Sequence, residues 1–362
     1  MKVEREIAGI SITFATGTFL PAYACVCLDS SCHHAASASL LATSLLLIYL
    51  MSSTGNPGKG SLTQAGALPL MILCCGAFCG FSARLTSFTA SGPGWLESQA
   101  LISGRAMQAA IDRIAFQDST TASLIKALLT GERTGIPQET ISAFRESGAS
   151  HILALSGLHL GIIYMLINRT LSIFGNTPGA RKIRSFLAVG ICGFYTMATG
   201  AGASIVRAFL FILLGEFATI TGRRRNIRIM IMTALLIQLA VSPLSIKDIG
   251  FQLSYAAMAG IAYIHPLLKD LWPSRSRLWE SSMLSISCQF TTGPLAYLYF
   301  GTFPKYFLLT NLIALPLTGL LIPAGAATLI LSEAGICPEI LIWATEKIAR
   351  ALIWSLGIIS EM

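Results

Sequence analysis

The chain has 362 residues, of which 54% are hydrophobic and only 12% are charged, and its mean hydropathy is +0.68. A soluble domain carries about 25% charged residues, so this composition excludes a water-exposed surface over most of the chain. The formal net charge of +8 comes mostly from basic clusters between apolar runs, and we do not interpret it as a nucleic-acid-binding signal. These values predict an all-α, polytopic helical membrane protein.

A membrane crossing needs about 20 apolar residues, and runs of this kind predict about ten or eleven spans. The run at 228–242 is short enough to be re-entrant, and the run at 306–331 contains Pro316 and Pro323, which favour a broken helix or two half-helices. The predicted spans are 7–28, 36–53, 67–83, 149–168, 184–201, 204–221, 228–242, 249–265, 281–300, 306–331 and 340–359.

Basic residues provide an independent check on these spans, because cytoplasmic loops of membrane proteins are enriched in Lys and Arg. With a cytoplasmic N-terminus, strict alternation places every basic cluster inside and residues 84–148 outside. The first apolar run reaches Cys27 without a clear cleavage site, so we expect no cleavable signal peptide. The clusters are Lys2 and Arg5; Lys59; Arg181, Lys182 and Arg184; Arg223, Arg224, Arg225 and Arg228; and Lys269, Arg275 and Arg277.

Residues 97–147 are the only stretch typical of water-facing structure. We predict short amphipathic helices on the periplasmic side, with Gly131 ending the second, Pro137 opening the third and Gly148 stopping it. Such helices either lie on the membrane surface or form a small cap on other helices, and the pattern does not separate these two. The predicted organisation is therefore 1–96, N-terminal transmembrane helices; 97–147, periplasmic helices; and 148–362, a second transmembrane domain.

Two cysteine-rich segments carry no predicted metal site. The segment CVCLDSSCHH (25–34) fits no common zinc spacing and straddles the end of a span. The segment CCGAFC (74–79) lies within a span, where Cys behaves as a small packing residue. We therefore predict no metal and no cofactor.

The segment GASHILALSGLHLGII (148–163) carries two histidines and two serines in an otherwise apolar run. A continuous helix would place His151, Leu155 and His159 on one stripe and Ser156 on an adjoining face. Polar groups inside a membrane helix generally face the bundle interior or a wet cavity. Helix–helix packing alone explains Ser156 equally well, but two histidines on one stripe favour a hydrated, functional lining.

Polar, Gly and Pro residues recur in the later spans. Arg207 lies a few residues into a span, where it either extends to the membrane surface or forms a fixed positive charge at a pore mouth, and Glu216 is too far round the same helix to pair with it. The pair Gly293-Pro294 is predicted to break the ninth span. Such interruptions are tolerated where they line a watery space. The predicted hydrophilic path is lined by His151, Ser156, His159, Arg207, Gln252, Ser254 and Asn311.

Four blocks of sequence, in order, resemble the ComEC family of competence channels. They are ALLTGERTGIPQETISAFRESGASHILALSGLHLGII, SIVRAFLF, LSIKDIGFQLSYAAMAGI and TGPLAYLYFGTFPKYFLLTNLIALPL, and the resemblance spans residues 97–332. It implies a multi-pass protein of the bacterial inner membrane, with a competence-type channel domain at 148–362. The implied function is the passage of single-stranded DNA into the cytoplasm during natural transformation.

The sequence also departs from that family. Many members carry an OB-fold domain before this region and a metallo-β-lactamase-like domain after it, and neither is recognisable in this sequence. We therefore expect either that separate proteins supply the DNA receptor, the nuclease and the cytoplasmic motor, or that this is a reduced form with a narrower role. The implied partners are single-stranded DNA, membrane lipid and those proteins.

Two other functions are compatible with the residues. A permease for another polymer or solute would need the same polar path without DNA. An intramembrane serine hydrolase would use Ser156 and His159 as a dyad, but a base on the same helix as its nucleophile leaves little room for substrate, and no nearby carboxylate orients it. We therefore predict that the chain is not an enzyme.

Overall fold

The computed structural model is built of α-helices. It describes residues 2–23, 35, 38–43, 46, 61–86, 94–175, 177–273, 276–301 and 303–362. No strand occurs in these ranges, so the predicted all-α class is confirmed. Two helices, Ala203–Ile220 and Phe307–Glu333, are long and apolar enough to cross a membrane, as expected for a helical membrane protein. The segment CVCLDSSCHH, Lys59 and most of the predicted span 36–53 lie outside the described residues.

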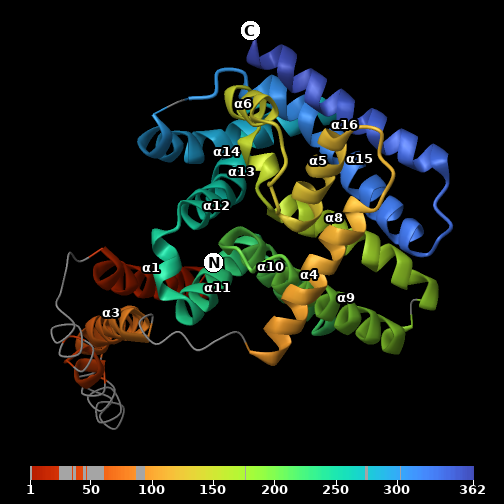
Figure 1. Ribbon diagram of the computed structural model, residues 1–362. Helices are drawn as coiled ribbons and strands as arrows, with labels where there is room; N and C mark the ends of the chain where they lie inside the picture. The colour runs from red at the N-terminus through yellow and green to blue at the C-terminus, as the bar shows by residue number, and fades with distance from the viewer. Residues whose placement is uncertain are drawn as a thin grey trace. The chain divides into compact units, whose positions relative to one another are not determined.

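Most of the helices are labelled in Figure 1. In chain order they are α1 (Lys2–Tyr23), α3 (Ser61–Thr86), α4 (Trp95–Asp112), α5 (Ser119–Thr130), α6 (Gln138–Glu146), α7 (Ser150–Leu153), α8 (Gly157–Leu171), η1 (Ser172–Phe174), α9 (Pro178–Ala198), α10 (Ala203–Ile220), α11 (Ile227–Val241), η2 (Pro243–Lys247), α12 (Ile249–Ala259), η3 (Gly260–Ile264), α13 (His265–Leu271), α14 (Arg277–Phe300), α15 (Phe307–Glu333) and α16 (Glu339–Ser360).

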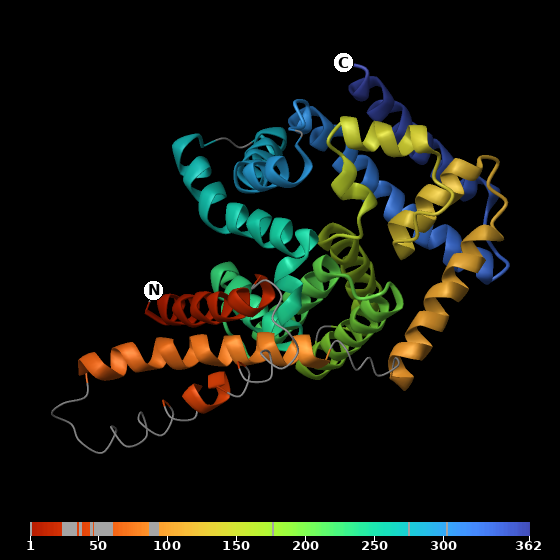
Figure 2. The same cartoon turned by 60° about the vertical axis from the view of Figure 1, so that its left-hand side comes forward.

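The chain divides into two compact units, one formed by 1–92 with 225–255 and the other by 93–224 with 256–362. In the first unit, α1 and α3 lie side by side (Figure 2). Their backbones approach closely, since a Cβ added to Gly17 would lie 2.1 Å from the carbonyl oxygen of Leu73. The hydroxyl of Ser11 donates to the carbonyl of Met232 at 2.9 Å, which joins α1 to α11.

The second unit contains the predicted periplasmic helices, α4, α5 and α6. Gly131 has a φ of 82° and ends α5, and Gly148 has a φ of 83° after α6, as their positions predicted. Pro137 is the residue that precedes α6 rather than its first member. The apolar side of α5 is fully buried against α15 and α16, so these helices are packed onto the bundle as a cap.

The predicted span 149–168 is not one helix, which corrects the sequence interpretation. Helix α7 ends at Leu153, Ala154 and Ser156 have extended backbone, and α8 begins at Gly157. His151 and His159 therefore belong to different helices, and the predicted stripe does not exist. The physical reason is a capping interaction at Ser156, described below.

Proline does not break the later helices, contrary to two predictions. Helix α14 continues through Gly293-Pro294, and α15 is one helix of 27 residues that contains Pro316 and Pro323. Each proline removes one backbone hydrogen bond, but packing of α15 against α16 along its length keeps the helix continuous. The segment η3 is a π-helical turn whose backbone packs closely on α14, because a Cβ added to Gly260 would lie 2.3 Å from the carbonyl oxygen of Ser287.

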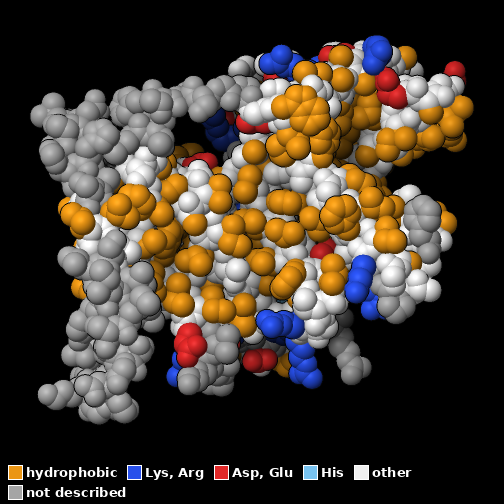
Figure 3. Space-filling view, turned by 90° about the horizontal axis from the view of Figure 1, so that it is seen from below, with side chains coloured by type: hydrophobic (Ala, Val, Ile, Leu, Met, Phe, Trp, Pro, Cys, Tyr) orange, Lys and Arg blue, Asp and Glu red, His pale blue; other side chains and the backbone are white. Residues whose placement is uncertain are grey.

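The surface of the described residues is largely apolar. Hydrophobic side chains cover most of the face seen in Figure 3, and the visible Lys and Arg side chains lie towards its margins. Helix α9 contributes an exposed apolar stripe that includes Ile183, Phe186, Ile191 and Phe194. A soluble protein rarely exposes apolar patches of this extent, whereas lipid-facing helices do.

Candidate functional site: a helix break beside a buried arginine

The break before α8 is held by a reciprocal capping interaction. The Ser156 hydroxyl accepts a hydrogen bond from the backbone N–H of Leu158 at 3.3 Å, and Nδ1 of His159 accepts one from the backbone N–H of Ser156 at 3.2 Å. Ser156 Oγ also lies 2.9 Å from the same Nδ1. This is a capping box in which His replaces the usual Glu or Gln. It stabilises a helix start inside the predicted span.

These hydrogen bonds assign the protonation of both histidines. Because Nδ1 of His159 accepts from a backbone N–H, the proton of the neutral ring lies on Nε2. That Nε2 is buried and has no hydrogen-bond partner within the described part of the chain. In His151 the proton lies on the other ring nitrogen, because its Nδ1 lies 3.2 Å from the carbonyl oxygen of Gly148 and must donate to it. His159 thus presents a buried donor, and His151 is exposed.

Arg207 of α10 lies beside the first turn of α8. Only 7% of its surface is exposed, so its side chain does not extend to the surface of the protein. A Cβ added to Gly157 would lie 3.5 Å from the Cβ of Ala208 and 3.9 Å from a terminal nitrogen of Arg207. These are ordinary van der Waals distances, so the guanidinium group lies next to the N-terminus of α8.

Asn311 lies in the second turn of α15, a helix that packs against α8. Its Oδ1 is buried without a hydrogen-bond partner in the described ranges. The preceding residue, Thr310, donates to the carbonyl of Ser147 at 2.7 Å. This bond fixes the start of α15 to the loop from which α7 and the helix break follow.

The other two predicted residues, Gln252 and Ser254, belong to the first compact unit. The side-chain amide of Gln252 donates to the carbonyl of Ile246 at 2.8 Å, so it stabilises the turn between η2 and α12. The structure thus brings Ser156 and His159 into contact and places Arg207 beside them, whereas Gln252 and Ser254 belong to the other compact unit.

The sequence analysis missed a buried polar cluster around Glu216 of α10. Its carboxylate accepts hydrogen bonds from the hydroxyl of Tyr164 on α8 and from the hydroxyl of Ser185 on α9. Glu216 and Ser185 are both buried. A carboxylate within an apolar helix was the only signal in the sequence, because its partners come from two other helices.

A polar cavity of about 290 Å³ lies where α4 meets the ends of α5 and α9. Arg105 and Gln108 from α4 and Glu132, just beyond α5, are among its lining residues. Hydrogen bonds from Thr134 hold the pKa of Glu132 below its ordinary value, so the carboxylate is ionised at neutral pH. Among the described residues, no group of three or more His, Cys, Asp or Glu side chains is placed to hold a metal ion.

Comparison with known proteins identifies the family. Residues 128–362 match the family described as Competence protein, which is more than half of the chain. The chain belongs to the Competence protein family. The matched range contains the helix break, Arg207 and all of the other predicted path residues. The family resemblance expected from the sequence is thereby confirmed.

The aligned region covers a quarter to a third of the length of three relatives of this Competence family member. It is 26% identical over 206 residues to ComE operon protein 3 of Bacillus subtilis, covering 57% of this chain and 25% of that protein. It is 26% identical over 203 residues to Competence protein ComA of Neisseria gonorrhoeae, covering 53% and 28%. It is 24% identical over 253 residues to an uncharacterized protein, YcaI, of Escherichia coli, covering 66% and 33%. No solved structure matches the chain.

Proposed function

We propose that this chain forms the membrane-embedded part of a channel that passes single-stranded DNA into the cytoplasm during natural transformation. Membership of the Competence protein family and the names of two relatives support a role in DNA uptake. The proposed location is the bacterial inner membrane, with a cytoplasmic N-terminus. The aligned region covers only a quarter to a third of the length of the relatives, and the proposed partners are single-stranded DNA, a DNA receptor, a nuclease and a cytoplasmic motor.

The observation that carries the proposal is the buried Arg207 beside the N-terminus of α8. A helix N-terminus favours negative charge, because its first N–H groups lack intrahelical acceptors and the helix dipole is positive there. A guanidinium group is the side chain best suited to phosphate oxygens. Every nucleotide carries one phosphate charge, which hydrocarbon excludes. The N-terminus of α8 and the guanidinium group of Arg207 both favour phosphate and lie at the same helix break. This position is therefore suited to contact the phosphates of a passing strand.

The remaining path residues extend that argument. The buried donor at Nε2 of His159 and the buried acceptor at Oδ1 of Asn311 are groups whose polar partners water or a passing nucleotide would supply. His151 completes the proposed lining within this unit, and Gln252 and Ser254 are proposed path residues of the other compact unit. A channel of this kind positions its substrate and catalyses no reaction, so the proposal assigns no catalytic residue.

The contact between Ser156 Oγ and His159 Nδ1 also has the length that a hydrolytic dyad needs. Helix capping explains that contact in full, because both groups also bind the backbone at the start of α8. A fluorophosphonate probe separates the two functions. Labelling of the wild-type protein that disappears in Ser156→Ala would favour a serine hydrolase over a channel.

The decisive experiment measures the cytoplasmic arrival of labelled DNA in a deletion strain. We expect DNA to cross the outer envelope normally but not to reach the cytoplasm, and Arg207→Ala to reproduce this defect at normal protein level. Arg207→Lys should restore part of the transport, because it keeps the charge. Arg113→Ala, which removes an exposed arginine paired with Glu333 at 3.0 Å, is the matched control.

Two outcomes would contradict the proposal. A deletion strain that transforms normally, in a cell with no second homologue, would show that this chain is not the conduit. Cysteines placed at His151, Asn311 and Gln252 should react with a small water-soluble thiol reagent in a cysteine-free background. Protection equal to that of a cysteine at the apolar position Leu213 would rule out a hydrated path.

A further inference from the structure

A second cavity, of about 370 Å³, lies where the end of α8 meets the first three turns of α9. Its lining is almost wholly apolar, and the exception is Arg184. We call it the α8–α9 groove; it is lined by Leu171, Gly179, Ala180, Ile183, Arg184 and Leu187. Its volume lies within the range of about 300–1,000 Å³ that is typical of ligand sites. An apolar groove with one cationic side chain suits an amphiphile with an anionic head.

The surroundings of the groove are basic. Arg181 lies one turn before Arg184 on the same side of α9, Lys182 follows it, and Arg169 lies in the last turn of α8. Arg169, Arg181 and Lys182 are exposed. The groove also begins at the N-terminus of α9, where the helix dipole adds positive potential. Phosphate is the anionic group that this charge would attract.

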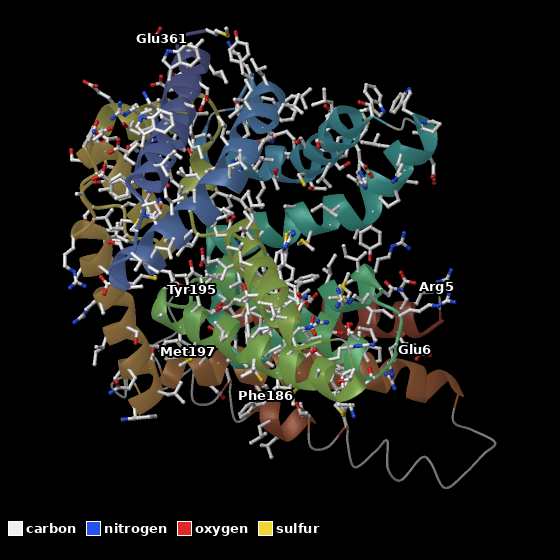
Figure 4. The ribbon with its side chains drawn as sticks, turned by 90° about the vertical axis from the view of Figure 1, so that its right-hand side faces the viewer. Arg5, Glu6, Phe186, Tyr195, Met197 and Glu361 are labelled. Carbon is white, nitrogen blue, oxygen red and sulfur yellow. The ribbon has the colours of Figure 1, made fainter. Side chains whose placement is uncertain are left out.

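The groove opens onto the exposed apolar stripe of α9. Ile183 is 64% exposed and Leu187 is 41% exposed, and Phe186 between them is 78% exposed (Figure 4). Ligands that reach the groove across this stripe come from the lipid phase rather than from water. The occupant therefore has an acyl chain as well as a negative head.

We propose that the α8–α9 groove binds one anionic phospholipid, with an acyl chain along Leu171, Ile183 and Leu187 and its phosphate on Arg184. Arg181 strengthens the attraction for the head group. Basic pockets between membrane helices are known to hold lipid head groups in this way. The site does not depend on whether the channel carries DNA.

The test uses the full chain purified in detergent and measures its thermal midpoint and the lipid retained. Phosphatidylglycerol and phosphatidylcholine with identical acyl chains are the probes, and inorganic phosphate is a third. We expect phosphatidylglycerol to raise the midpoint well above the effect of phosphatidylcholine, and phosphate to leave it unchanged. The double variant R181Q/R184Q should lose most of that difference. The matched control R223Q/R224Q removes the same charge and should keep it.

A second variant fills the groove without changing its charge. A Cβ on Gly179 would meet no atom within 4 Å, so Gly179→Leu has room and should also favour the helix. We expect it to abolish the shift caused by phosphatidylglycerol while leaving the lipid-free midpoint unchanged or higher. Gly190→Leu, at an equally open position of the same helix, should keep the shift.

Three results would overturn the proposal. The first is an equal shift with both phospholipids, which indicates general lipid solvation. The second is a shift with inorganic phosphate alone, which indicates a simple anion site. The third is a full phosphatidylglycerol shift in both R181Q/R184Q and Gly179→Leu, because one variant removes the proposed phosphate ligand and the other removes the acyl space.

Discussion

The hydroxyl of Tyr195 on α9 donates a hydrogen bond to the backbone carbonyl of Leu129, 2.5 Å away in the last turn of α5. The last carbonyls of a helix have no intrahelical donor, so this bond satisfies one of them. It also joins the predicted periplasmic cap to a neighbouring helix of the bundle, beside the polar cavity. Tyr195 is labelled in Figure 4.

Removing that hydroxyl should weaken the attachment of the cap. We expect Tyr195→Phe to lower the free energy of unfolding by about 1 kcal/mol, the usual contribution of one hydrogen bond, measured by thermal or denaturant unfolding in detergent. Tyr306→Phe is the matched control, because its hydroxyl bonds the carbonyl of Met362 at 3.1 Å in an exposed position. Equal effects of the two variants would argue against a special role for the Tyr195 bond.

Substitutions in the capping box can distinguish a structural role of His159 from a role in transport. Ser156→Ala should lower stability by about 1 kcal/mol through loss of the cap. His159→Gln should retain most of the stability, because Gln is an ordinary partner in a capping box, whereas His159→Leu should not. If the imidazole also lines the path, His159→Gln should reduce DNA arrival despite normal folding. Normal transport in that variant would restrict His159 to a structural role.

Glu216 should be essential to the packing of α8, α9 and α10. Glu216→Ala leaves the buried hydroxyls of Tyr164 and Ser185 without their acceptor, so we expect a loss of about 2 kcal/mol or more. Glu216→Gln keeps an acceptor and should lose less. The exposed Glu333→Gln is the control and should change stability by about 1 kcal/mol at most. Thermal midpoints that rank in another order would contradict this account.

Close backbone contact between α1 and α3 predicts opposite effects for two glycines on one helix. Gly17→Ala forces a Cβ against the carbonyl of Leu73 and should destabilise the protein by about 1–3 kcal/mol. Gly9→Ala has open space and should leave stability unchanged or raise it, since Ala favours helix over Gly. The measurement is the unfolding midpoint of each variant. If Gly9→Ala is also destabilising, the loss of stability in Gly17→Ala cannot be attributed to the contact with the carbonyl of Leu73.

Charge alternation predicts the orientation of the chain in the membrane. A reporter fused after Phe116 should be periplasmic, and one fused after Arg225 should be cytoplasmic. Enzymatic reporters that are active on only one side of the membrane measure this directly. Both reporters on one side would mean that the number of crossings between the two positions is even and not odd.

The sequence was sufficient to predict helix ends that depend on a single residue. It was not sufficient to predict the break between α7 and α8. Gly131 and Gly148 end their helices through a positive φ, which glycine adopts readily. Ser156 is a common N-cap residue, but the capping rule expects Glu or Gln three residues later, so His159 hid the signal. The sequence pattern therefore predicted one continuous helix, with His151 and His159 on the same stripe.

Features that depend on distant partners were beyond local rules. Pro294, Pro316 and Pro323 favour helix breaks locally, but neighbouring helices override that preference. The partners of Glu216 lie 52 and 31 residues away in the sequence, and no spacing rule connects them. The charge of Arg207 within an apolar run drew attention to it in the sequence, but its place beside Gly157 depends on the packing of α8 on α10.

The two prolines of α15 have a mechanical consequence. Pro316 and Pro323 remove the helix hydrogen bonds to the carbonyls of Leu312 and Gly319, four residues earlier in each case. Seven residues are almost two full turns, so both gaps lie on the same face of the helix. Bends at such gaps add in one direction instead of cancelling. Any bending of α15 at these two gaps is therefore confined to a single plane, and Asn311 lies before the first gap, at the end that Thr310 holds to the carbonyl of Ser147.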